Sequence, residues 1–559
     1  MFFKGVGMKP RFGQGLTALV FALAVGLFAQ ISAANAGMTI SPDVQELGLT
    51  LRENAELGRM PSMFYAVPNQ NDNKSWRLCK DIDDKVCTDS VDVGAIAHLS
   101  PCTAETQLSC IAAIWAVDSA GNKIAGEFVK HAGVDPRYTI GEIPSIDYPR
   151  SDGLGSIWKI PGVMNSAGKD TYFVASELTG WGRKSAGTET RKAQFDYSNL
   201  ISGIIPIQEV SANVLVLTAV DGAINPGGAF GSNGTQYAAD GSVCAATEAG
   251  TCYASRQFPE NYKFGMTLRM SKKLSGWFHG RIYLPSVTIK DWKAGQEISI
   301  EAEPVKVPSL EFVVPNAEIP QAIRNLVFDG REWGMKGDGK SRTYISEYLG
   351  GQRSMDLVTG FVPSYKDKAT TTDSYWSFKT LQQEGNMNDV MKCSASNNAL
   401  SGIVTTNALT YSAGPPSYDK STGSLNYKVA SPHYEADGKT EALGSYDLAL
   451  RSDVARCIYG FSKAPISAEI SITSLDGEKK VATTLVNERN GWLYLSAKGF
   501  TFSSPVINIK LTQEAVVVPA PSATKAASKV VKITCIKGKT KKVVSGIMPV
   551  CPKGYKLSK

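Results

Sequence analysis

Ten cysteines are the residues whose type and spacing say most about chemistry. Three pairs, Cys79 with Cys87, Cys102 with Cys110 and Cys244 with Cys252, are each eight residues apart; the remaining neighbours are Cys393 with Cys457 and Cys535 with Cys551. In an exported chain, cysteines at such spacings favour disulfides over metal sites. Eight helical residues would separate the Cα atoms by about 12 Å, whereas a disulfide needs about 5 to 6 Å. Pairing of neighbours therefore predicts hairpins or loops, although other pairings stay open.

Lysines of the C-terminal tail form a second group. Ten lysines lie from Lys525 onward and no Asp or Glu follows Glu514, whereas the rest of the chain after residue 36 carries about −6. A concentrated basic patch attracts polyanions. We expect anionic cell-envelope polymers as partners, with no nucleic acid partner, and polyanion binding by Lys537, Lys539, Lys541, Lys542, Lys553 and Lys556. The alternative is a solvated tail that only aids export or solubility.

Catalytic motifs are mostly missing. The sequence has no GxSxG motif, and its four histidines, His98, His131, His279 and His433, are scattered singly without HExxH or CxxC. Ser156–Lys159 and Ser166–Lys169 fit a serine-x-x-lysine pattern, but no Lys-Thr-Gly follows. No catalytic residue, metal or cofactor is predicted. Paired carboxylates of a glycosidase meet in space rather than in sequence, so a hydrolase remains the alternative.

Aromatic residues give a third candidate site. A platform on which a sugar ring stacks is one interpretation, and core anchors of a β-sandwich are the favoured one. The residues concerned are Trp277, Phe278, Trp292, Tyr375 and Trp376.

Two segments resemble known proteins. Residues 431–434, 444–461 and 491–505 (SPHY, GSYDLALRSDVARCIYGF and GWLYLSAKGFTFSSP) resemble a family of large secreted actinobacterial proteins that has no established activity. The tail, with ITCIKGK and VCPKGYK, is similar to a basic two-cysteine tail found on other secreted proteins of the same bacteria. This resemblance implies export and a shared C-terminal address or attachment device, and it implies no reaction.

Strands must position all of these residues. Between residues 444 and 511, apolar residues alternate with polar ones at Tyr446, Leu448 and Leu450, again at Ile466 to Ile472, and at Ile507 to Leu511. That period of two is typical of half-buried strands. Asp476-Gly477 and Asn490-Gly491 are turn dipeptides of antiparallel hairpins. The whole stretch is therefore predicted to be a run of β-strands, and much of the upstream chain has the same pattern.

The sequence predicts a mainly β fold with two disulfide-stapled antiparallel β-sandwich-like domains and a small basic C-terminal lobe. Residues 37–305 are expected to form the first domain and 306–515 the second, with a boundary in the proline-rich stretch 304–320. Residues 516–529 have the composition of a Pro/Ala/Ser linker, and 530–559 are expected to form a basic disulfide hairpin.

The N-terminal 36 residues predict export. Lys4, Lys9 and Arg11 precede the apolar run 16–28, and Ala34-Asn35-Ala36 is a small-x-small cleavage site. No second apolar run has membrane length, so no transmembrane segment is expected in the mature chain. We therefore expect an extracellular or surface-associated protein that binds, or has a structural role, at the cell envelope through its tail, with a secreted polysaccharide or peptide hydrolase as the alternative.

Overall fold

The computed structural model describes residues 39–53, 61–66, 77–133, 139–183, 194–212, 237–330, 334–336, 340–381, 389–395, 399–462, 466–473, 479–481, 483–502, 506–513 and 529–558. The chain forms two compact units, Met1–Thr512 and Gln513–Lys559. The signal peptide predicted for residues 1–36 and nearly all of the predicted linker lie outside the described residues. None of the helices in the described part of the chain is long and apolar enough to span a membrane.

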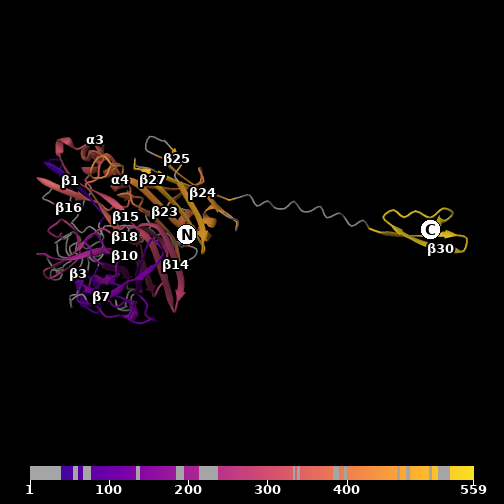
Figure 1. Cartoon of the computed structure of the whole chain (residues 1–559), viewed down its shortest axis with the longest axis horizontal. Helices are drawn as coiled ribbons and strands as arrows, with labels where there is room; N and C mark the ends of the chain where they lie inside the picture. The colour runs from indigo at the N-terminus through magenta and orange to yellow at the C-terminus, as the bar shows by residue number, and fades with distance from the viewer. Residues whose placement is uncertain are drawn as a thin grey trace, which may run out of the picture. The chain divides into compact units, whose positions relative to one another are not determined.

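The fold is mainly β, as the alternating sequence pattern predicts. Hydrogen bonds join 22 strands of the first unit into one network (Figure 1). These strands are β1 Glu46–Leu51, β2 Met63–Ala66, β3 Arg77–Cys79, β4 Asp92–His98, β5 Cys110–Val117, β6 Lys123–Ala125, β7 Glu127–Ala132, β8 Gly155–Lys159, β9 Thr171–Arg183, β10 Gln194–Ser211, β11 Cys244–Glu248, β12 Thr251–Ser255, β13 Lys263–Met270, β14 Gly276–Trp292, β15 Gly295–Pro315, β16 Gly334–Lys336, β17 Arg342–Ser346, β18 Thr371–Thr380, β19 Leu400–Thr406, β23 Leu443–Arg451, β26 Thr483–Arg489 and β27 Trp492–Thr501.

Two smaller sheets and several short helices complete the described chain. One sheet of the first unit contains β20 Thr410–Tyr411, β21 Ser417–Asp419, β22 Ser424–Ala430, β24 Ile466–Thr473, β25 Lys479–Val481 and β28 Val506–Gln513. The second unit contains β29 Val531–Lys537, β30 Thr540–Gly546 and β31 Lys556–Leu557. The helices are α2 Lys85–Asp89, α3 Gln321–Val327, α4 Gln352–Gly360, α5 Val362–Tyr365, α6 Asp389–Ala395 and α7 Ser452–Tyr459, with 3-10 turns η3 Pro144–Ile146 and η5 Asn316–Glu318.

The sequence stretch 444–511 is partly as predicted. It contains β23, β24, β27 and β28, and Asn490 and Gly491 both have positive φ in the turn between β26 and β27. The expectation of strands throughout is wrong at α7, which begins directly after β23. Along α7, Val454, Ala455 and Ile458 share one buried face, and Gly460 ends the helix in the left-handed conformation. Asp476-Gly477 lies outside the described residues.

A central sheet lies between two hydrophobic cores. Its strand order is β3-β2-β4-β9-β10-β18-β14-β19-β23-β27-β26, and all neighbours are antiparallel except β14 and β19. The first core draws mainly on residues between 64 and 302, and the second on residues 40–51 and 310–511. Side chains alternate along a strand. Phe278 and Ile282 of β14 therefore enter the first core, while Trp277 enters the second.

The shared sheet explains why the predicted division at residue 305 is not confirmed. β15 runs without a break from Gly295 to Pro315, across the proline-rich stretch, and pairs with β14 and β13 in its first part and with β18 and β1 in its second. Figure 1 shows β10, β14, β15 and β18 close together, as their pairings with β18 require. Within β15, Pro304 stands opposite Ile282 and Pro308 opposite Thr372, so these prolines do not mark a linker.

Arg281 on β14 is the most deeply buried cation among the described residues. Its Nε lies 2.6 Å from Oε2 of Glu53, just after β1, and its guanidinium donates to the carbonyls of Thr406, Ala408 and Leu409. Burial opposes the charge, but Glu53 and Tyr411 outweigh it, so the pKa of Arg281 is raised. One guanidinium thus holds three segments that are far apart in the sequence.

Arg281→Met should destabilise the first unit by about 3 to 5 kcal/mol, because the substitution leaves the partly buried Glu53 and three carbonyls without the cation. Arg342→Met is the matched control, since Arg342 Nε also lies 2.6 Å from a glutamate, Glu46, but on the exposed surface. Urea unfolding followed by tryptophan fluorescence measures both. Equal midpoints for the two variants would contradict a structural role for Arg281.

Asp447 of β23 is a buried acid whose carboxylate accepts hydrogen bonds from residues of β14 and β19. Its Oδ2 accepts from the backbone amide of Leu284 at 2.9 Å and from the Thr405 hydroxyl at 3.0 Å. Burial raises the pKa of Asp447 from 3.8 to about 6, against the lowering effect of these hydrogen bonds. The folded state therefore holds this proton more tightly than the unfolded state does, and the stability linked to it is lost as pH rises from about 4 to 6.

Asp447→Asn should remove that loss. The free energy of unfolding of the variant relative to the wild type should rise by roughly 2.4 kcal/mol between pH 4 and pH 7, because a tenfold difference in proton affinity corresponds to about 1.4 kcal/mol and the unfolded aspartate is already partly ionised at pH 4. Asp437→Asn is the control, because the pKa of exposed Asp437 is shifted in the opposite direction: hydrogen bonds with Thr440 and Lys439 lower it to about 2. Its difference from wild type should stay constant over this range. If the unfolding midpoints of Asp447→Asn and of the wild type change with pH in the same way, the raised pKa of Asp447 is refuted.

Candidate functional site

All five disulfides join the neighbouring cysteines that the spacing favours. They are Cys79–Cys87, Cys102–Cys110, Cys244–Cys252, Cys393–Cys457 and Cys535–Cys551, with Cα atoms 5.1 to 5.8 Å apart. Cys244 and Cys252 lie on the hairpin of β11 and β12, while Cys393–Cys457 links α6 to α7. Disulfides are typical of an oxidising compartment outside the cytoplasm.

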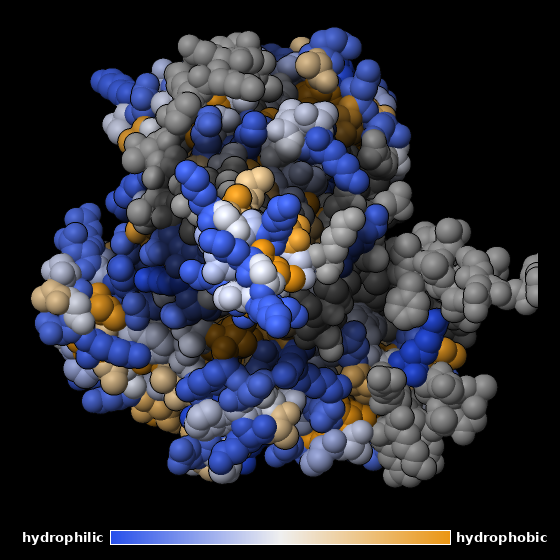
Figure 2. All heavy atoms as spheres, turned by 90° about the vertical axis from the view of Figure 1, so that its right-hand side faces the viewer, coloured by the Kyte–Doolittle hydropathy of each residue, from blue (hydrophilic) through white to orange (hydrophobic). Residues whose placement is uncertain are grey.

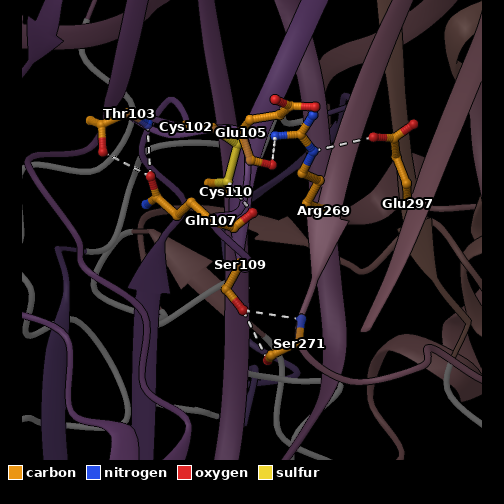
Figure 3. Close-up of a disulfide and its surroundings, with 9 residues drawn as sticks. All are labelled: Cys102, Thr103, Glu105, Gln107, Ser109, Cys110, Arg269, Ser271 and Glu297. Atoms are coloured by element: carbon orange, nitrogen blue, oxygen red, sulfur yellow. Dashed lines mark hydrogen bonds and ion pairs between the residues drawn. A yellow bond between two sulfur atoms is a disulfide. The ribbon is translucent and has the colours of Figure 1, made fainter. Parts of the chain in front are cut away.

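Figure 3 shows how one of these short loops is fixed to the sheet. Within the loop, the Gln107 side chain accepts from the amide and the hydroxyl of Thr103 at 2.7 and 2.9 Å. Arg269 of β13 donates to the carbonyl of Glu105 at 2.9 Å and pairs with Glu297 of β15 at 3.2 Å. The Cys102–Cys110 loop therefore has a structural role, because Arg269 links it to β13 and β15 in addition to its disulfide.

The second unit is the basic lobe that the sequence predicts, here the sheet of β29, β30 and β31. β29 and β30 form a hairpin around Gly538-Lys539, and β31 pairs along the other side of β29. Cys535, at the centre of β29, is fully buried and bonded to Cys551. A chain this short buries too little apolar surface to fold without a staple, so the disulfide has to hold the lysines on a defined sheet.

The register divides the lysines between two faces. Residues directly opposite in an antiparallel pair share a face. Ile536 is opposite both Lys541 and Lys556, so these three side chains form a row across the sheet, with Lys532 further along the same face. We call this the open face. Lys537 and Lys542, which follow Ile536 and Lys541 in the sequence, lie on the other face together with Cys535. We call that face the disulfide face.

Exposed apolar residues also gather in the lobe, where only a basic patch is predicted from the sequence. Seven of the thirteen exposed large hydrophobic residues of the described chain lie in its last 30 residues: Val530, Val531, Val543, Ile547, Met548, Val550 and Leu557. The face of the molecule in Figure 2 is mostly hydrophilic, with hydrophobic atoms in small patches. The signal available in the sequence was the run Ile547-Met548-Pro549-Val550 within an otherwise basic tail.

The aromatic residues do not form an exposed platform. Trp277, Phe278 and Trp376 are 3%, 0% and 1% exposed. Trp277 packs over Gly402, where any Cβ would come within 2.2 Å of the indole ring, and its Nε1 donates to Ser394 at 3.0 Å. Trp292 is half-buried between Arg269 and Lys290, whose cationic groups lie 4.4 and 5.2 Å from its ring. Burial thus favours the core interpretation for three of them.

The first unit contains a polar cleft of about 360 Å³ between β18, β10 and the approaches to β11 and β12. Two ion pairs line it: Arg52 with Asp373 at 2.7 Å, and Arg256 with Asp240 at 3.0 Å. Hydrogen bonds from Ser242, and then Arg256, lower the pKa of Asp240. The partners are up to 321 residues apart in the sequence, so no local motif could have indicated this cleft.

His131 does not form a triad with Asp152 and Ser100. Asp152 lies between Ser100 and His131: the Ser100 hydroxyl donates to the carboxylate at 3.0 Å, and His131 Nε2 lies 4.0 Å from it. In a triad the imidazole contacts the hydroxyl instead. His279 is fully buried and stacks on Tyr411 with ring centroids 3.6 Å apart, and burial lowers its pKa well below the usual value. Among the described residues no group of three or more His, Cys, Asp and Glu is placed to hold a metal ion.

Comparison with protein-family models, with curated proteins and with solved structures finds no match to this chain.

Removing the disulfide of the lobe should unfold it. In the chain-entropy model, a loop of 16 residues contributes about 3 kcal/mol, more than so small a sheet can lose. After Cys535→Ser with Cys551→Ser, trypsin should cleave within the lobe much faster, as mass spectrometry of the fragment 530–559 would show.

Cys102→Ser with Cys110→Ser is the control, because that loop keeps its contacts with Arg269. The lobe of this control should resist trypsin as in the wild type. A lobe that stays resistant without its own disulfide would mean that strand pairing alone holds the lysines.

Proposed function

We propose that the protein is a secreted, non-catalytic binding or structural protein of the cell envelope, attached through its C-terminal lobe to anionic envelope material such as phosphate-bearing polymers. The observation that carries this proposal is the lobe itself. It is a separate compact unit whose described residues hold eight lysines and no acid, on a sheet closed by a disulfide.

Geometry makes the lobe better suited to a polyanion than a random basic tail would be. Neighbouring strands are about 4.8 Å apart, so Lys541 and Lys556, on either side of Ile536, hold their charges in a fixed row. A preformed array loses less conformational entropy on binding than a flexible chain. Attachment by such a row should weaken with salt, because counterions compete for the charges.

The cleft supports a binding or structural role more than acid catalysis. A glycosidase needs one carboxyl group whose pKa is raised so that it stays protonated. Asp240 has a lowered pKa, and both cleft aspartates are paired with arginines. Export, surface location and the actinobacterial resemblance belong to the same proposal; the five disulfides agree with an oxidising destination.

Partition between purified cell envelopes and supernatant tests the attachment. The chain 37–559 should sediment with the envelopes at low salt and be released at about 0.5 M salt, where screening is strong. A chain ending at Val518 should remain in the supernatant at both. If the two chains sediment alike, the lobe is not the anchor.

Two matched pairs of substitutions test whether envelope binding depends on one face of the folded lobe or only on its net charge. Lys541→Gln with Lys556→Gln removes two charges from the open face, and Lys537→Gln with Lys542→Gln removes two from the disulfide face. The open-face variant should lose several-fold more envelope binding. Equal losses would mean that net charge alone acts, without a preferred face.

A further inference from the structure

The lobe combines two kinds of surface that one partner must satisfy together. Its described residues carry eight lysines, and the same 30 residues expose Val543 at 61%, Ile547 at 65%, Met548 at 88% and Val550 at 80%. Small size explains part of this exposure, since a short chain cannot bury all of its apolar surface. It does not explain two consecutive apolar side chains at the tip of a turn.

That turn has a definite place on the lobe. Gly546 ends β30 opposite Val531, and a Cβ at this glycine would lie about 3.9 Å from the backbone of Pro549, so Ile547 and Met548 form the tip between them. Val530 and Val531, both exposed, lie at the same end of the sheet. Lys529 and Lys532 flank these two valines in the sequence.

The open face joins this apolar end to the lysine row. On this face Val543 is opposite Thr534. The row on one side of this pair contains Lys541, Ile536 and Lys556, and the row on the other side contains Ser545 and Lys532. The open face therefore carries both cationic and apolar side chains, with the polar Thr534 and Ser545 among them, and β30 leads from it to Ile547 and Met548. This is the pattern of a surface that lies at a membrane interface, with apolar groups in the lipid and lysines at the headgroups.

Other occupants fit only half of this surface. A free polyanion would neutralise the lysines and leave the apolar tip in water. A second copy of the lobe would cover the apolar residues but bring eight lysines against eight without an intervening acid. An anionic lipid surface supplies negative charge and an apolar layer in one partner.

We propose that the lobe docks on an anionic lipid surface, with the open face toward the headgroups and Ile547 and Met548 inserted among the acyl chains. This inference rests on the proposed attachment function and names its partner. Binding then has a salt-sensitive part from the lysines and a salt-resistant part from the apolar tip.

Vesicle sedimentation of the full mature chain tests the inference. The probes are vesicles of phosphatidylglycerol, vesicles of phosphatidylcholine, and soluble inorganic polyphosphate. The wild type should bind phosphatidylglycerol at least tenfold more tightly than phosphatidylcholine and keep part of that binding at about 0.5 M salt. Ile547→Ser with Met548→Ser should lower phosphatidylglycerol binding at least tenfold and abolish the salt-resistant part, with polyphosphate binding unchanged.

Leu557→Ser is the matched control, because Leu557 is 60% exposed in the same lobe but lies opposite Cys535, on the disulfide face. It should bind vesicles as the wild type does. Resistance of the fragment 530–559 to trypsin shows that each variant keeps a folded lobe.

The outcomes separate this inference from the proposed function. Unchanged vesicle binding by the Ile547/Met548 variant, or polyphosphate binding without vesicle binding, overturns the lipid proposal and leaves electrostatic attachment standing. A concentration-dependent dimer that the variant abolishes, without vesicle binding, also overturns it, in favour of a second copy. Failure to bind either polyphosphate or vesicles contradicts both proposals.

Discussion

A single buried guanidinium, that of Arg281, ties the first unit together. It lies on the long strand β14, which the two hydrophobic cores share, and its partners are Glu53 after β1 and carbonyls at and just after the end of β19. A buried cation is tolerated only where its donors are satisfied. The chain segments around it must therefore come together for any of them to be stable there, which makes the interaction a constraint on the whole fold.

The sheet that contains β14 also explains why the first unit does not divide at its proline-rich stretch. Two cores form because a sheet has two faces, and both halves of the sequence contribute strands to that sheet. β15 carries the chain from one set of partners to the other without a linker. A mutation in β14 is accordingly expected to affect both cores at once.

The lobe, unlike the first unit, is held by a disulfide more than by a hydrophobic core. It has one disulfide, one buried cysteine and little core, and its surface keeps lysines and apolar residues exposed side by side. The first unit buries Trp277, Phe278 and Trp376 and pairs the charges of its cleft, and this contrast supports the proposal that the lobe is the part that contacts a partner. Under the proposed function, the first unit is what the lobe would hold at the envelope.

The sequence by itself determined the mainly β class and the basic composition of the lobe and favoured the pairing of neighbouring cysteines that the structure contains, because these depend on local periodicity, composition and loop length. α7 was missed because eight residues of helical period directly follow a strand, too few to outweigh the alternation around them. Only the tertiary structure decided that Trp277, Phe278 and Trp376 are core residues and that Arg52 meets Asp373, because such contacts join segments hundreds of residues apart. It also decided which lysines share a face with Ile536, since that depends on strand register, which composition does not encode.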